Sequence, residues 1–176
     1  NDNRYKTING LFTVEFTIKS TDNQNTDNII YSLPLSNDPL DASLRASINS
    51  DGTLTQYLQT ENGTYTVSTQ DSVIDGISRL FTIIKDSENV MTLYVNTEVV
   101  DQVHAPGTNL TGTNFLYIGG YASSAEYNYS GYMDDFSIYK TANTVDQLDN
   151  RYNCWLDNNS VLLTPTPTPS VTPSGG

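Results

Sequence analysis

The sequence predicts an all-β fold, an antiparallel β-sandwich or jelly roll built from many short strands. Three observations lead to this fold class. Apolar and polar residues alternate over short stretches, as in residues 12–19, whose even-numbered positions are all apolar. Turn signals such as Asn49-Ser-Asp-Gly separate these stretches about every 8 to 12 residues. Only residues 144–152 carry apolar side chains at helical spacing.

Each expected strand is a short alternating stretch that ends at a turn signal. Residues 1–10 are polar and predict an edge strand or a loop. We expect strands at residues 12–19, 29–35, 44–48, 54–60, 65–67, 80–85, 90–96 and 99–103, a strand–loop–strand unit over 115–139, and one helix at 144–152.

The C-terminal residues 164–176 differ in composition from the rest of the chain. They alternate Thr and Pro and end in Ser-Gly-Gly, with Val171 as the only core-forming residue. Such a segment favours extended polyproline II and acts as a semi-rigid spacer. We therefore expect one sandwich domain over residues 1–163 and a disordered linker over 164–176. The linker resembles the Thr-Pro segments between modules of secreted bacterial polysaccharide-degrading proteins and cellulosome components.

The chain is strongly acidic, with a net charge of −12 and a sequence pI near 4.1. Nucleic acids and anionic membrane surfaces are poor partners for it, because both require clustered Lys and Arg. No apolar run approaches the roughly 18 to 20 residues that a membrane span requires. Calcium is a more suitable partner, since it binds carboxylates and carbonyls. The alternative is that the acidity serves solubility alone.

Four local patterns, taken in order, resemble the laminin-G-like, concanavalin A-like jelly-roll domains of bacterial extracellular proteins. They are Phe12-Thr-Val-Glu-Phe-Thr-Ile-Lys, Phe81-Thr-Ile-Ile-Lys with Met91-Thr-Leu-Tyr-Val-Asn, Leu116-Tyr-Ile-Gly-Gly, and Gly131-Tyr-Met-Asp-Asp-Phe-Ser-Ile-Tyr. The resemblance covers residues 11 to about 153 and implies the same sandwich. The chain departs from the family pattern at Leu80, where a Trp is usual, and at Thr97, where a Gly is usual.

The resemblance also implies a structural calcium site, in which an Asp that opens the last strand is one ligand. Asp134 matches that position. Strand alternation places Asp134 on the same inward face as Phe136 and Ile138, where a carboxylate needs a metal, backbone amides or a cation to satisfy it. Asp134 is therefore the candidate calcium ligand. The alternative is that Asp134 accepts backbone N–H bonds at a bend.

The loop within the 115–139 unit is the candidate ligand-binding site. Aromatic faces stack on the C–H faces of sugar rings while carboxylates and amides bond the hydroxyls. Tyr57, Tyr65 and Tyr94 are candidates for an additional outward-facing platform. For each Tyr the alternative is ordinary packing with the hydroxyl at the surface. The predicted ligand-binding residues are Tyr121, Glu126, Tyr127, Asn128 and Tyr129, with Tyr132 in the same group of loop tyrosines.

Catalysis is not expected, although glucanases share the resembled fold. Glycoside hydrolysis needs two carboxylates about 5 to 10 Å apart, and the paired Glu-x-Asp-x-Glu pattern of laminarinase-type enzymes does not occur in this chain. His104 is the sole histidine and is expected at the surface. Cys154 is the sole cysteine and is expected to be a small buried hydrophobe among apolar neighbours.

These observations together predict a non-catalytic polysaccharide-binding module of a secreted or cell-surface, multimodular bacterial protein. We expect a monomer that uses its linker to reach other modules of the same chain. An adhesion or sensor ectodomain that binds a protein or peptide is the alternative, and a structural spacer is a third possibility, because fold does not decide function.

Overall fold

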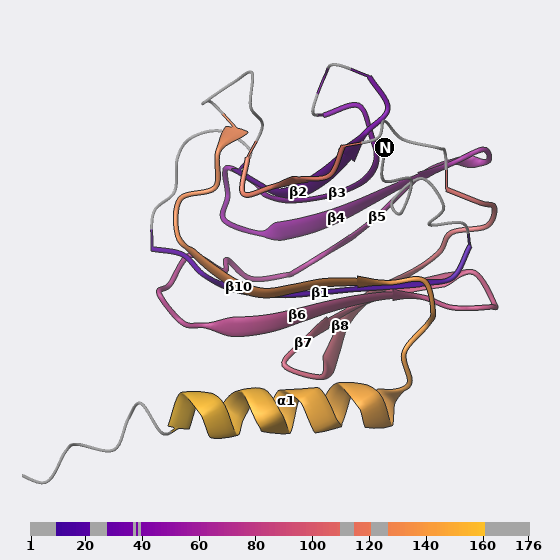
Figure 1. The fold of residues 1–176 in the computed structure, drawn as a ribbon. Coiled ribbons are helices and arrows are strands. Elements are labelled where there is room, and N and C mark those ends of the chain that lie inside the picture. Colours follow the sequence, from indigo (N-terminus) through magenta and orange to yellow (C-terminus); the bar gives the residue numbers. More distant parts are fainter. Residues whose placement is uncertain are drawn as a thin grey trace, which may run out of the picture.

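A computed structural model describes residues 10–21, 28–36, 38, 40–109, 115–120 and 127–160, with side chains described as far as Asp157. These residues form ten strands in two sheets and one C-terminal helix (Figure 1). The elements are β1 Phe12–Lys19, β2 Asn28–Pro34, β3 Ala42–Ile48, β4 Leu54–Thr60, β5 Gly63–Ser68, β6 Arg79–Lys85, β7 Val90–Val95, β8 Glu98–His104, β9 Tyr117–Ile118, β10 Tyr132–Tyr139 and α1 Val145–Ser160.

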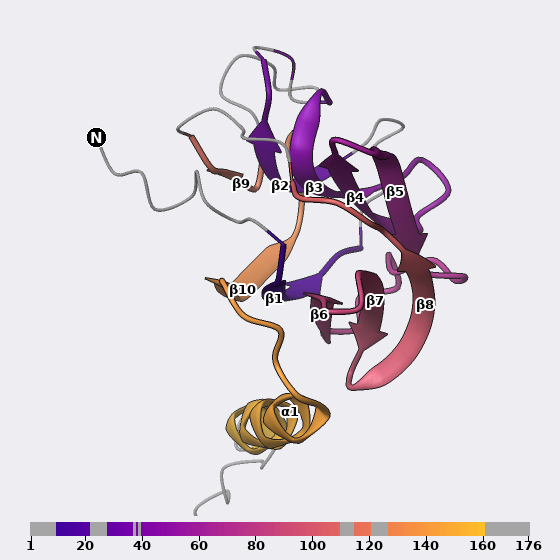
Figure 2. The same ribbon diagram turned by 90° about the vertical axis from the view of Figure 1, so that its right-hand side faces the viewer.

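The two sheets pack face to face as an antiparallel sandwich. One sheet has the order β10-β1-β6-β7-β8 and the other the order β5-β4-β3-β2-β9. The paired edges are therefore β10 with β9 on one side and β8 with β5 on the other, as the end-on view shows (Figure 2). The predicted all-β jelly roll is confirmed. The first strand of the 115–139 unit is shorter than expected, because only two of its residues pair with β2.

The core lies between the sheets and centres on four aromatic rings. Phe16 stacks on Phe81 with ring centroids 5.5 Å apart and meets the edge of Tyr31 at 5.8 Å. Tyr31 in turn meets Phe136 of β10 at 5.3 Å, so the chain of rings joins both sheets. The Tyr31 hydroxyl donates to Gln56 Oε1, and burial raises the pKa of Tyr31 well above its usual range. This pair satisfies a polar atom that would otherwise be costly at this depth.

The inward orientation expected for Asp134 is wrong, because β10 contains a β-bulge. Ser137 pairs with Glu15 and Asp134 with Thr17, so three steps on β10 match two on β1. Asp135 takes the strain of the extra residue with a φ of 54°. The bulge reverses the alternation, so Met133 packs against the core with Phe136 while Asp134 is exposed.

The helix α1 lies against the outer face of the sheet that contains β1, β6 and β10 (Figures 1 and 2). It begins with a capping box, in which Gln147 N donates to Thr144 Oγ1 at 3.3 Å and Thr144 N donates to Gln147 Oε1 at 2.9 Å. Leu148, in the first turn of α1, is buried. Arg151 pairs with the buried Glu15 carboxylate and lies 4.6 Å over the ring of Tyr139. Two side chains thus hold the helix to the sheet.

Two expectations for single residues have different outcomes. His104 is exposed, as predicted. Cys154 is exposed, so the expected burial is wrong. The helix runs to Ser160, eight residues beyond its predicted end, and Cys154 follows Leu148 by six positions. At 3.6 residues per turn, Cys154 therefore points about 120° away from the side that faces the sheet.

Some predicted features lie outside the described residues. These are residues 1–9 of the polar N-terminal segment, Tyr121, Glu126 and the Thr-Pro linker at 164–176. Within the described part of the chain, no helix is both long and apolar enough to cross a membrane.

Replacement of Arg151 by Met tests the attachment of α1. The side chain of Glu15 is only 7% exposed and that of Arg151 is 32% exposed, so the change leaves a nearly buried carboxylate without its cation. We expect a loss of about 2 kcal/mol in the free energy of unfolding, measured by urea denaturation. The matched change Arg79→Met, which breaks the more exposed pair with Asp75, should cost less than about 1 kcal/mol. Equal losses in the two variants would contradict the assigned role of Arg151.

Candidate binding site

An open groove lies where the edge strands β9 and β10 of the two sheets come together. It holds about 550 Å³ and has a wall of apolar side chains beside a pair of carboxylates. Two glycines, with φ of 74° and 154°, bring bare backbone to its surface. The lining residues are Ile118, Gly119, Tyr129, Gly131, Met133, Asp134, Asp135 and Phe136.

The carboxylates of Asp134 and Asp135 are the charged groups of the groove. Both residues are exposed, because the bulge in β10 turns Asp134 away from the core. Asp134 Oδ1 accepts a hydrogen bond from Asp135 N at 2.9 Å, which fits the expected alternative of a carboxylate at a bend. Across the described residues, neither carboxylate has a cation as partner. Several oxygen lone pairs therefore remain available to a ligand.

Tyr129 lines the groove, and its hydroxyl contacts the backbone of the adjoining strands. Its hydroxyl lies 3.1 Å from Lys19 O and 3.0 Å from Tyr132 O, so it links the end of β1 to the start of β10. Burial of the half-covered ring raises the pKa of Tyr129 to about 12. A Cβ at Gly131 would come within 2.4 Å of the Tyr129 hydroxyl, so this tight packing requires glycine. Tyr129 thus offers part of its ring to the groove while its hydroxyl serves the fold.

Comparisons with known proteins agree with this architecture. Residues 2–149 match a family model described as the concanavalin A-like lectin/glucanases superfamily. The chain belongs to this superfamily. No curated protein matches the chain.

Several solved structures share the superfamily fold at low sequence identity. The CBM40 domain of the Ruminococcus gnavus IT-sialidase, bound to α2,3-sialyllactose, is 18% identical with a TM-score of 0.66, over 82% of this chain and 83% of that one. The receptor-binding domain of the botulinum neurotoxin C/D mosaic serotype is 17% identical with a TM-score of 0.69, over 86% of this chain but 38% of that one. A heptameric SAP-like pentraxin from Limulus polyphemus is 20% identical with a TM-score of 0.57, over 83% and 71%.

Of the remaining predicted ligand residues of this concanavalin A-like domain, the structure describes Asn128 and Tyr127. Asn128 is exposed and forms a parallel bridge with Ile29, next to the edge strand β9. Tyr127 is half-buried and does not line the groove. Asn128 also lies so close to Gly120 that a Cβ there would approach its Oδ1 to 2.2 Å. Of the predicted residues, the structure therefore brings Tyr129 and Asp134 together in one hollow.

Phe115 and Ile118 are exposed apolar residues that were not among the predicted ligand-binding residues. Tyr132 is 80% exposed, whereas Phe115 is 63% and Ile118 is 49% exposed. Phe115 and Ile118 were expected in a regular strand, with part of its surface in the core. Pairing with β2 at only two residues leaves Phe115 outside the sheet. The sequence pattern does not predict the exposure of Phe115, because it does not report how many residues of the strand pair with β2.

The expected platform of Tyr57, Tyr65 and Tyr94 does not form a single surface. Tyr65 packs against the core, so its outward orientation is wrong; it shares the inward alternation of Val67. The ring of Tyr57 is covered by the guanidinium of Arg45 at 4.1 Å. Tyr94 is half-buried on β7, in the opposite sheet from Tyr57.

The raised pKa of Tyr129 predicts a specific loss of stability at high pH. The neutral hydroxyl is favoured in the folded protein, whereas the unfolded chain loses this proton near pH 10. The stabilisation of the folded protein by the neutral Tyr129 hydroxyl is therefore fully present below about pH 10 and is lost as the pH rises toward 12. We expect the stability difference between wild type and Tyr129→Phe, measured by urea unfolding, to shrink over that range. A difference that is constant from about pH 9 to pH 11 would contradict this role.

Proposed function

We propose that the chain is a non-catalytic carbohydrate-binding module that holds a polysaccharide in the groove between β9 and β10. One observation carries the proposal: two exposed carboxylates without a cation partner stand beside apolar side chains in an open groove. Sugar recognition needs this combination, because hydroxyls require strong acceptors while the C–H faces of the ring require apolar contact.

The shape of the groove favours a chain ligand over a small molecule. It is shallow and open, so a sugar can enter without a lid moving aside. Gly119 lets a ligand approach the backbone closely, because no atom lies within 4 Å of the position that a Cβ would take there. Tyr132 projects into solvent between Gly131 and Met133, where it can stack on a sugar beyond the groove itself.

The fold comparisons support this class of function without defining the ligand. A CBM40 domain that binds sialyllactose shares the fold over most of both chains. We also propose that the module belongs to a secreted or cell-surface multimodular bacterial protein. In that protein, residues 164–176 would link it to other modules and raise their concentration at the polysaccharide.

Calcium binding remains a proposal, with Asp134 and Asp135 as its protein carboxylates. Among the described residues, no group of three or more His, Cys, Asp or Glu is positioned to hold a metal. Calcium takes six to eight oxygens and accepts carbonyls and waters as well as carboxylates. Two adjacent carboxylates fit part of such a shell, and carbonyls, waters or sugar hydroxyls would complete it.

Loss of both groove carboxylates should weaken glycan retention. Affinity gel electrophoresis against a panel of soluble polysaccharides should retard the wild-type chain. The double variant Asp134→Asn, Asp135→Asn should bind the retarding polysaccharide at least about tenfold more weakly, because hydrogen bonds to charged groups contribute about 1.5–3 kcal/mol each.

The control for that experiment removes the same charge elsewhere. Glu88 and Glu98 are exposed and lie in the β6–β7 turn and on the opposite edge strand β8. Relative to its own mobility in a polysaccharide-free gel, Glu88→Gln, Glu98→Gln should be retarded by polysaccharide as much as the wild type is. Tyr132→Ala should reduce retention with no loss of melting temperature, since its ring is 80% exposed. Free migration of the wild type on every polysaccharide would refute the proposal.

Calcium should stabilise the domain if the carboxylate pair binds it. At a free calcium concentration of 100 times Kd, mass action contributes about 2.7 kcal/mol and raises the melting temperature by several degrees. Excess chelator should reverse this shift, and Asp134→Asn should remove it. Identical melting curves in chelator and in calcium would exclude a calcium site that is coupled to folding.

A further inference from the structure

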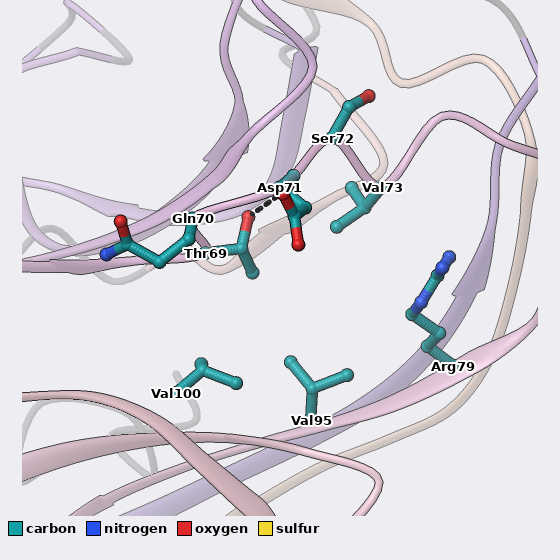
Figure 3. A pocket seen from close by; sticks show the side chains of 8 residues that line it. All are labelled: Thr69, Gln70, Asp71, Ser72, Val73, Arg79, Val95 and Val100. Carbon is teal, nitrogen blue, oxygen red and sulfur yellow. Dashed lines mark hydrogen bonds between the residues drawn. The ribbon is translucent and has the colours of Figure 1, made fainter.

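A second hollow lies on the far side of the sandwich from the groove, where β5 and β8 are the edge strands. Figure 3 shows the side chains that line it. It encloses about 320 Å³. One wall is the segment 69–73 that follows β5, and the facing wall is Val95 at the end of β7 with Val100 of β8. Arg79, at the start of β6, closes one end. The cavity thus lies between the two sheets.

The 69–73 wall is held firmly in place. Leu54 N donates to Thr69 Oγ1 at 3.0 Å, and Thr69 N donates to Leu54 O at 2.9 Å. Val73 N donates to Gly52 O at 2.8 Å. Gly52 has a φ of 86°, and a Cβ there would come within 2.3 Å of Ser72 Oγ, so the segment lies directly on the β3–β4 turn.

A hydrogen bond between the sheets also holds the cavity open at a fixed width. Ser68 N of β5 donates to Asp101 Oδ2 of β8 at 2.8 Å, directly beside Thr69 and Val100. The two walls are therefore linked next to the cavity. The cavity is therefore preformed, which lowers the free-energy cost of binding a ligand.

The cavity combines apolar walls with uncompensated negative charge. Val73, Val95 and Val100 supply the apolar surface. The Asp71 carboxylate is exposed, and within the described residues it has neither a hydrogen bond nor an ion pair. Arg79 does not neutralise it, because the two terminal guanidinium nitrogens of Arg79 donate to the two Asp75 carboxylate oxygens, at 2.7 and 2.6 Å.

We propose that this cavity binds a primary alkylammonium group, as carried by a lysine side chain or a free aliphatic diamine. The methylene chain would lie against the valines, and the ammonium would pair with the carboxylate of Asp71. The net charge of −12 further favours a cation over an anion.

The size of the cavity agrees with this ligand class. A volume of about 320 Å³ is at the small end of ligand pockets, which run from about 300 to 1,000 Å³. It accommodates one side chain or a molecule of that size, and not an oligosaccharide. This inference is independent of the glycan groove, since the two hollows share no lining residue.

Titration of the isotope-labelled chain with small amines tests the proposal. Nα-acetyl-lysine amide should shift the amide resonances of Asp71, Val73, Val95 and Val100 in a saturable way. Nα-acetyl-norleucine amide has the same chain without the charge and should bind at least tenfold more weakly. Asp71→Asn should weaken the lysine derivative at least tenfold, whereas Glu88→Gln, which removes an equally exposed carboxylate, should leave it unchanged.

Further arms separate the sources of the amine and keep the two proposals distinct. Tighter binding of 1,5-diaminopentane than of the lysine derivative assigns the site to free diamines, and the reverse assigns it to peptide lysine. Val100→Phe should fill the cavity and abolish both. Polysaccharide in the gel should retard Asp71→Asn as much as it retards the wild type, each relative to its own mobility in a polysaccharide-free gel. Equal binding of the lysine and norleucine derivatives, or full binding by Asp71→Asn, would overturn the inference.

Discussion

One extra residue in β10 decides how this edge of the sandwich presents its side chains. Without the bulge at Asp135, strict alternation would direct Asp134 toward the core with Phe136 and Ile138. With it, Met133 takes the inward place and both carboxylates face solvent. Bulges at sheet edges commonly re-aim side chains in this way. The bulge therefore allows β10 to complete the core and to line an acidic groove at the same time.

The aromatic residues around β10 also divide into those that stabilise the fold and one that is exposed at the surface. Phe136 and Tyr31 join the sheets through the core, and Tyr129 ties the end of β1 to the start of β10 through its hydroxyl. Tyr132 is left free at the surface. The groove and the cavity both lie where edge strands of opposite sheets meet, because side chains there have a neighbour on one side only. They differ in chemistry: the groove at β9–β10 is open and suits sugar hydroxyls, whereas the cavity at β5–β8 is smaller, apolar and anionic.

Alternation of apolar residues was sufficient to predict the fold class and the positions of nearly all strands, because each sheet is buried on one face and alternation reports that burial directly. It failed where one residue changes the register. Nothing in Tyr-Met-Asp-Asp-Phe distinguishes a bulged strand from a regular one, so Asp134 was placed on the wrong face while its position at the strand start was right. The cavity walls were also beyond sequence reasoning: Asp71 lies far from Val95 and Val100 in the chain and comes near them only through the packing of the two sheets.

The central claim is that a polysaccharide binds between β9 and β10, and amide chemical-shift mapping tests it most directly. The labelled chain would be titrated with a short oligosaccharide of a polysaccharide that retards it. The proposal predicts saturable shifts confined to Ile118, Gly119 and residues 129–136, around the groove. Shifts centred on Arg45 of β3 and Tyr57 of β4, with the resonances of the groove residues unchanged, would contradict it.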